Sequence, residues 1–257
     1  MTSHDPLLEE LAALRRTAPV DLLDRVLLGA DLADSYTEIV GPTGRAFVAW
    51  NGRGVTTFVP VEAVGTRDAF EERYPRTASY VDAPPEALAR LLDLAIETGR
   101  LGQLPVDLSA LGDFQRKVLL KCAEIPPGEI RPYGWIAREL DHPGAVRAVG
   151  SALGRNPVPV LIPCHRVVRT DGRIGNYAYG SPMKRELLEH EGLDPESIES
   201  AARRGVRLIG SDTTHIYCFP TCRHAKRIAD THRVEFRNEE AAEADGYRAC
   251  KVCRPAA

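Results

Sequence analysis

The sequence predicts an α+β protein built from a small sheet domain, a helical domain with a helix-turn-helix, and a small C-terminal module held by four cysteines. Three patterns support this fold class: a hairpin near residues 46–59, two short helical segments at 133–140 and 145–153, and two close cysteine pairs. A length of 257 residues is sufficient for two modest domains or one domain and a module. The expected parts are 1–108, 109–193, a linker at 194–209, and 210–257.

The N-terminal part is expected to combine helices with one hairpin. Apolar residues recur at helical spacing in the first 35 residues. They are Leu7, Leu8, Leu11, Leu14, Leu22, Leu23, Val26 and Leu27. Apolar runs at 46–50 and 55–59 flank an Asn-Gly turn at 51–54, a strong hairpin signal. A helix is expected over 86–97, with Gly99 as its C-terminal cap.

The middle of the chain is expected to be helical. A helix over 114–124 places Cys122 on its apolar stripe, so we interpret Cys122 as a core residue. The segments 133–140 and 145–153 have helix-turn-helix spacing, and the second has a surface of small residues. A slim helix suits either close approach to a nucleic-acid backbone or tight packing against another helix. The composition of 191–209 is polar and predicts a linker.

The charge distribution allows nucleic acid as a partner although the whole chain is slightly acidic. The net charge is −3, but it divides into −8 for residues 1–114, +4 for 131–173 and +2 for 218–257. Phosphate binding requires a local basic face rather than a basic protein. We therefore expect Arg166 of the central basic segment to contact DNA. The alternative is that these arginines form only a solvated face.

Cys164 and His165 follow an apolar run at 158–162, which suggests a nucleophilic thiolate at a buried strand end. The pair alone would also fit a core cysteine beside an unrelated histidine. However, the hexapeptide at 163–168 (PCHRVV) resembles the active-site motif of the O6-alkylguanine-DNA alkyltransferases, which move an alkyl group from guanine onto their own cysteine. The resemblance extends from about 114 to 192 through the motifs RAVG, NPVP and GNY.

The reaction that this resemblance implies is an SN2 displacement at carbon on a base extruded from the duplex. Cys164 would accept the alkyl group irreversibly, and His165 would remove the thiol proton, through a water. Glu191 would hold the imidazole in the required tautomer. The implied substrate is O6-alkylguanine in DNA, with O4-alkylthymine as a further candidate. The implied enzyme is a methylated-DNA–[protein]-cysteine S-methyltransferase that acts once.

The same resemblance implies the remaining roles. Tyr133 would protonate the leaving guanine, Arg147 would fill the gap left by the flipped nucleotide, and Asn156 would brace the loop before the cysteine. Tyr177 would wall the alkyl pocket, followed by Ala178 where several relatives have serine, which puts the alkyl preference in doubt. The family also implies an RNase H-like sheet domain, minor-groove binding of double-stranded DNA, and a monomer.

Four cysteines near the C-terminus predict a zinc site. Cys218 and Cys222, then Cys250 and Cys253, form two close pairs of thiolates suited to tetrahedral zinc. Their surroundings resemble the zinc module of the Ada adaptive-response proteins, in which the first cysteine also accepts a methyl group from a DNA methylphosphotriester. Phe219 replaces an arginine common in that family. Cys218 is therefore either a second methyl acceptor or a ligand of a structural zinc that docks on DNA.

Two other functional classes stay open at this level. The chain could be a lesion sensor without catalysis, although such sensors in this family replace the cysteine that Cys164 provides. It could also be a zinc-thiolate redox module on an inactive scaffold. Zinc is the only cofactor expected, and no organic cofactor is implied. Without an apolar run of about 18 residues or a secretory leader, we expect a cytoplasmic protein without membrane contact.

Overall fold

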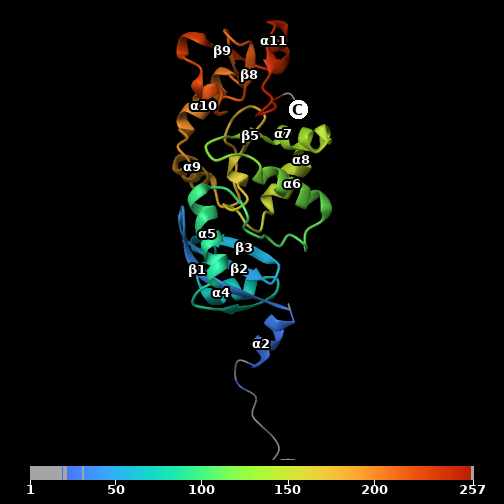
Figure 1. The fold of residues 1–257 in the computed structure, drawn as a ribbon, viewed down its shortest axis with the longest axis vertical. Coiled ribbons are helices and arrows are strands. Elements are labelled where there is room, and N and C mark those ends of the chain that lie inside the picture. The colour runs from blue at the N-terminus through green and yellow to red at the C-terminus, as the bar shows by residue number, and fades with distance from the viewer. Residues whose placement is uncertain (1–18, 20–21, 31, 256–257) are drawn as a thin grey trace, which may run out of the picture.

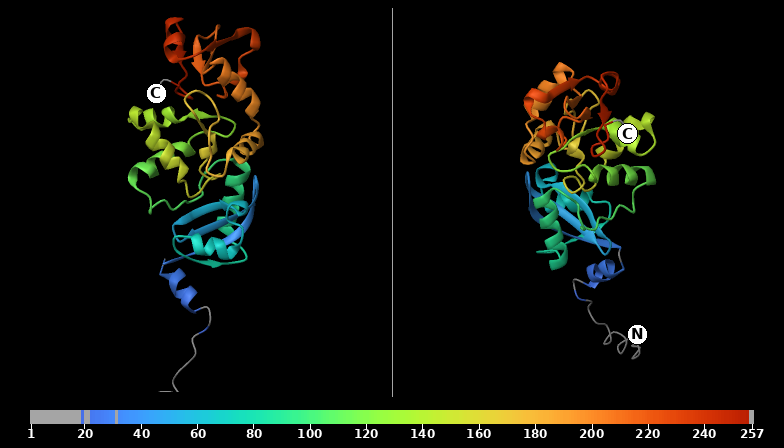
Figure 2. Two further views of the ribbon diagram at one scale, coloured as in Figure 1. Left: turned by 180° about the vertical axis from the view of Figure 1, so that it is seen from behind. Right: turned by 45° about the horizontal axis from the view of Figure 1, so that its top comes forward.

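The computed structural model describes residues 19, 22–30 and 32–255. Its three parts follow one another along the long axis of the molecule: the sheet domain, then the helical domain, then the cysteine-rich module (Figures 1 and 2). The predicted helical stripe from Leu7 to Leu14 lies outside the described residues. In the part of the chain that is described, no helix is long and apolar enough to cross a membrane.

The N-terminal domain is a four-stranded sheet with helices packed beside it. The predicted hairpin is confirmed, with Trp50 opposite Val55. The strand order is β3-β2-β1-β4, and the outer β4 runs parallel to β1. The helix expected over the first 35 residues ends at Gly29, and residues 33–35 already belong to β1, so that prediction was wrong at its end. The elements are α2 Leu22–Gly29, β1 Ala33–Gly41, β2 Gly44–Asn51, β3 Gly54–Pro60, α3 Val61–Val64, α4 Arg67–Arg73, β4 Thr77–Tyr80 and α5 Glu86–Thr98.

The helical domain follows the predicted pattern closely. Gly99 caps α5 in the left-handed conformation, as expected. The pair of short helices at 133–140 and 145–153 is present, with Cys122 fully buried in the preceding helix. Two short segments, β5 and β6, pair in parallel and bring residue 131 beside 167. The elements are α6 Asp113–Ala123, β5 Arg131–Pro132, α7 Tyr133–Glu139, η1 Pro143–Ala145, α8 Val146–Gly154, η2 Cys164–Arg166, β6 Val167–Val168 and α9 Ser181–His190.

The segment predicted as a polar linker is folded, and this corrects the expectation. Asp194 caps α10, which has Pro195 at its first position and ends at Gly205 in the left-handed conformation. Only a small part of this helix packs against the protein: Pro195 and Ala202 are buried, whereas the two arginines at its end are exposed. The linker region also contains the start of β7.

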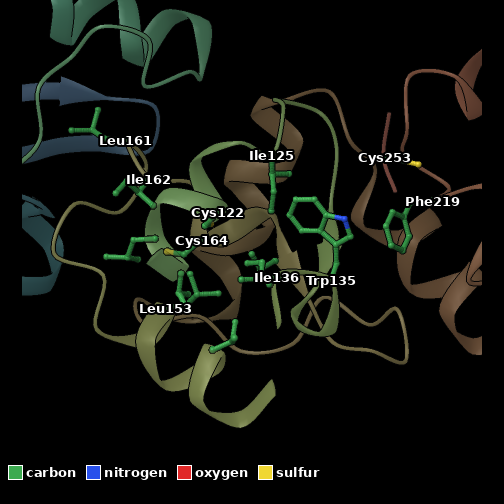
Figure 3. Close-up of a cluster of buried hydrophobic side chains, with 14 of the residues drawn as sticks. Cys122, Ile125, Trp135, Ile136, Leu153, Leu161, Ile162, Cys164, Phe219 and Cys253 are labelled. Carbon is green, nitrogen blue, oxygen red and sulfur yellow. The ribbon is translucent and has the colours of Figure 1, made fainter. Parts of the chain in front are cut away.

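The C-terminal module is a four-stranded sheet of order β10-β8-β7-β9. Its elements after α10 Pro195–Arg204 are β7 Leu208–Ser211, β8 Ile216–Cys218, η3 Ala225–Arg227, η4 Asp230–His232, β9 Arg233–Phe236, α11 Glu239–Ala244 and β10 Arg248–Ala249. One cluster of buried apolar side chains extends from the sheet domain through the helical domain into this module. Figure 3 shows part of it, from Leu161 and Cys164 past Trp135 to Phe219 and Cys253.

Candidate active site and metal centre

Cys164 begins the 3-10 turn η2, at the end of a strained loop. Val160 in this loop has a φ of 72°, a left-handed conformation that a β-branched residue adopts only under constraint. Asn156 supplies that constraint. Its side-chain Nδ2 donates to Ile162 O at 2.8 Å, and its Oδ1 accepts from Val158 N at 3.1 Å. The predicted bracing role of Asn156 is therefore matched by two hydrogen bonds across the loop.

Replacing Asn156 by alanine is expected to lower the free energy of unfolding by about 2 kcal/mol, because it leaves the buried N–H of Val158 without its partner and removes one of the two hydrogen bonds that Ile162 O accepts. Chemical denaturation of the wild type and Asn156→Ala measures this. The same change removes a donor 3.3 Å from the Cys164 sulfur, so alkyl transfer should slow by about tenfold. An unchanged unfolding midpoint would show that Pro157 and Pro159 hold the loop without Asn156.

The Cys164 sulfur rests as a thiol. The residue is 7% exposed, and burial raises the pKa of its thiol, while the Asn156 hydrogen bond lowers the pKa by a smaller amount. A thiol is a poor nucleophile, so a reaction at this sulfur requires a base that removes the proton during attack.

His165, the predicted base, is held by Glu191. Its Nε2 lies 2.8 Å from Glu191 Oε1. Burial by itself would raise the pKa of Glu191, but the hydrogen bonds from His165 and Arg166 outweigh burial and lower it to about 2. A carboxylate only accepts hydrogen bonds, so Nε2 carries the proton and Nδ1 has a free lone pair. Nδ1 is buried and has no hydrogen-bond partner among the described residues. Burial lowers the pKa of His165, which keeps the ring neutral.

Glu191 should make stability depend on acid pH. The folded pKa of about 2 lies below the ordinary value of 4.5, so its contribution is full above pH 4.5 and disappears as the pH falls toward 2. The shift corresponds to a contribution on the order of 3 kcal/mol. Denaturation between pH 6 and pH 3 should therefore show a steeper loss for the wild type than for Glu191→Gln. Equal slopes for the two proteins would contradict the pairing.

Arg166 is a structural residue, which corrects its expected role in DNA binding. The side chain is 1% exposed, and its guanidinium donates to Ile125 O and Gly99 O, each at 2.6 Å, as well as to Glu191. It thus ties α6, the end of α5 and α9 together beneath the active site. No donor of this buried group faces solvent where a phosphate could bind.

Two tyrosines lie near the cysteine. Tyr133 is half-buried at the start of α7, and its pKa is raised, first by burial and then by Cys164. Tyr177 lies deeper, and burial followed by the proximity of Cys164 raises its pKa strongly. Its hydroxyl oxygen is buried, and no described residue lies at a distance and angle suitable for a hydrogen bond to it. Both predicted tyrosines pack against the buried cluster that contains Cys164.

Lys184 is a site residue that the sequence did not reveal. It is fully buried in α9, and its Nζ donates to Val167 O at 2.6 Å and Ile174 O at 2.7 Å. It therefore connects β6, which follows Cys164, to the loop that leads to Tyr177. Burial lowers the pKa of Lys184 to about 8. In the sequence, the one indication of its burial is its spacing: Lys184 lies three and four residues before Leu187 and Leu188, on the same face of the helix.

The outer surface of α8 carries small residues and one arginine. Arg147, Ala148 and Ser151 are exposed, whereas Gly150 faces inward near the ring of Tyr133. A Cβ at Gly150 would meet only the Tyr133 ring, at 3.9 Å, so the packing against α7 does not require glycine, whereas Ala148 and Ser151 leave a low outer surface. Arg147 extends from that surface.

The four C-terminal cysteines converge as predicted. Because β10 runs parallel to β8 with Ala249 opposite Tyr217, Cys250 follows beside Cys218. Cys222 and Cys253 come from the turns after these strands, and the four sulfurs all lie within 4.8 Å of one another. Zinc–sulfur bonds of about 2.3 Å require sulfurs about 4 Å apart, so this buried all-thiolate set fits a tetrahedral zinc ion.

A cleft of about 560 Å³ opens beside this cluster. Cys218 and Cys250 line it, whereas Cys222 and Cys253 lie behind them. The cleft also has basic walls, formed by His224, Arg227, His232, Arg248 and Lys251.

Comparisons with known proteins agree with this geometry. Residues 113–193 match the family model of the 6-O-methylguanine DNA methyltransferase DNA binding domain, and 199–256 match the metal binding domain of Ada. A methylated-DNA–protein-cysteine methyltransferase of Mycobacterium bovis is 35% identical over 159 residues, which is 61% of this chain and 91% of the relative. A rat protein of the same name is 47% identical over 100 residues, 38% of this chain and 46% of the relative.

A solved structure of Mycobacterium tuberculosis OGT in complex with DNA superposes with a TM-score of 0.51 at 32% identity. It matches 62% of this chain and 93% of that protein. The chain therefore belongs to the methylated-DNA–protein-cysteine methyltransferase family.

Proposed function

We propose that this protein repairs alkylated DNA by moving the alkyl group of O6-alkylguanine irreversibly onto Cys164, with O4-alkylthymine as a second substrate. The observation that supports this most is the buried thiol of Cys164 beside a His165–Glu191 pair whose free Nδ1 is also buried. In the reaction the Cys164 proton passes to His165 Nδ1 through a water. The sulfur then forms a bond to the alkyl carbon as the bond from carbon to O6 breaks.

The leaving guanine must take up a proton or hydrogen bond as negative charge develops on it. The hydroxyl of Tyr133, the first residue of α7, is the donor, and Cys164 is close enough to influence its pKa. Tyr177 forms the wall of the alkyl pocket. Its buried hydroxyl lies close enough to the Cys164 sulfur to influence the pKa of both groups.

The DNA partner is a duplex with an alkylated base, bound through the α7–α8 helix-turn-helix in the minor groove with the base flipped out. The exposed small residues of α8 allow close approach, and Arg147 fills the space of the extruded nucleotide. We further propose that the N-terminal domain is RNase H-like, on the basis of its β3-β2-β1-β4 order, and that the protein acts as a monomer.

The C-terminal module binds zinc through Cys218, Cys222, Cys250 and Cys253, and zinc keeps such thiolates deprotonated near neutral pH. We propose Cys218 as a second methyl acceptor, for methylphosphotriesters. Its place in the wall of the basic cleft supports this, although Cys250 shares that position. If Cys218 is a ligand only, the cleft serves to dock the phosphate backbone.

One labelling experiment tests these assignments. The zinc-loaded protein is incubated with duplex DNA that carries O6-methylguanine and methylphosphotriesters, and the methylated peptides are mapped by mass spectrometry. Methyl groups on Cys164 and Cys218 would support both transfers, and methyl on Cys164 alone would limit the module to docking or structure. DNA binding without methyl on Cys164 would favour a lesion sensor.

A further inference from the structure

The zinc-ligand loop contacts the segment that positions the alkyl-transfer residues. We call residues 218–222 the ligand loop and residues 128–132 the connecting segment. Thr221, between the first two zinc ligands, is 7% exposed, and its Oγ1 accepts a hydrogen bond from Ile130 N at 2.9 Å. The two groups are buried and lie 91 positions apart in the sequence, so this contact joins two of the three parts of the molecule.

Further bonds from the module reach the connecting segment. Lys226 Nζ donates to Gly128 O at 2.9 Å, and Arg223 N donates to Glu129 Oε1 at 3.2 Å. The guanidinium of Arg131 lies 5.2 Å from the centre of the Phe219 ring and pairs with Glu129. Figure 3 shows Phe219 of the ligand loop close to Trp135 of α7. Lys226 thus holds the C-terminal module to the helical domain.

The connecting segment in turn holds three parts of the active site. Gly128 N donates to Glu191 Oε2 at 3.0 Å, and Glu191 is the partner of His165. Arg131 and Pro132 form β5, which pairs with β6 directly after the turn that contains Cys164. Pro132 is also the N-cap of α7, whose first residue is Tyr133.

We propose that the ligand loop is a positioning element for alkyl transfer at Cys164, with Thr221 as its main contact. The inference rests on the proposed function and assigns the C-terminal module a role in the first reaction that is separate from any chemistry at Cys218. Thr221 fixes Ile130, and Ile130 lies between the residue that holds Glu191 and the residue that precedes Tyr133. A zinc-bound ligand loop therefore keeps His165 and Tyr133 correctly positioned relative to the Cys164 sulfur.

The test compares the full-length, zinc-loaded wild type with Thr221→Val, Thr221→Ser and Thr231→Val. Valine removes the acceptor for Ile130 N at nearly constant volume, and serine retains it. Thr231 is an exposed threonine of the same module and provides the matched control. Single-turnover transfer from duplex DNA that carries O6-methylguanine is measured over a range of DNA concentrations. Amide hydrogen exchange of the peptide that contains Gly128 is measured in parallel.

We expect Thr221→Val to lower the rate constant at saturating DNA by about tenfold, as for the loss of one buried hydrogen bond, with the half-saturating DNA concentration unchanged. Exchange at Gly128 should become faster, although Gly128 itself is not bonded to Thr221. Thr221→Ser and Thr231→Val should behave as the wild type. Zinc content, measured for every variant, should stay at one ion per chain.

An unchanged saturating rate constant in Thr221→Val would overturn the inference, as would a defect only in the half-saturating DNA concentration. The latter would show that the module docks DNA without positioning the site. If the wild type transfers no alkyl group, the proposed function fails. The exchange measurement still decides the structural connection, because unchanged exchange at Gly128 in Thr221→Val would contradict it.

Discussion

Cys164→Ala is expected to abolish alkyl transfer to this domain while leaving the fold intact. The sulfur is the atom that forms the new bond, so no neighbouring group replaces it. The side chain is buried, and its truncation removes one sulfur from a well-packed site, which costs about 1–2 kcal/mol of unfolding free energy. Transfer is measured with duplex DNA labelled in the O6-methyl group, and binding of the same duplex is measured by fluorescence anisotropy.

Cys122→Ala provides the matched control. Cys122 is the other buried cysteine of the helical domain, and Figure 3 shows the two side chains near one another. Burial raises the pKa of the Cys122 thiol well above its ordinary value, and no described residue donates a hydrogen bond that would activate its sulfur. We expect near-normal transfer in Cys122→Ala. Residual labelling in Cys164→Ala that disappears in the double variant would instead identify Cys122 as an acceptor.

The fold could be predicted where the signals are local. The Asn-Gly hairpin, the cap of α5 at Gly99 and the helix pair α7–α8 each depend on a few adjacent residues, and the structure contains all of them. The strand β4 could not be predicted, because its pairing with β1 depends on residues about 44 positions away. The helix α10 was missed because its sequence is polar overall and so resembles a linker, although its few apolar residues gather on one face of the helix.

The active site could be predicted to a similar extent. The Cys164–His165 motif and the four cysteines carry their chemistry in the sequence, and the structure brings each set together. The burial of Arg166 and Lys184 was missed, because a cation is ordinarily exposed and only the folded chain provides carbonyl partners for a buried one. The contact from Thr221 to Ile130 joins positions too far apart for any local pattern.

Loss of the metal should affect stability more than any other change considered. A structural zinc site contributes on the order of 10 kcal/mol to the folding of a small domain, because the ligands come together only in the folded state. In this module the four cysteines join the adjacent strands β8 and β10 at one edge of the sheet, and Cys222 and Cys253 are fully buried. We therefore expect Cys222→Ser, or chelation of the wild type, to unfold residues from β7 onward.

Hydrogen exchange across the whole chain measures this effect, and zinc analysis accompanies it. Peptides from β7, β8 and β9 should lose protection in Cys222→Ser, whereas peptides from β1 to β3 should keep theirs, since that sheet shares no ligand with the metal. Cys122→Ala, which alters a buried cysteine outside the cluster, should retain its zinc and its protection. Full protection of β7 to β9 in metal-free protein would mean that the apolar core around Phe236 and Tyr217 folds the module without zinc.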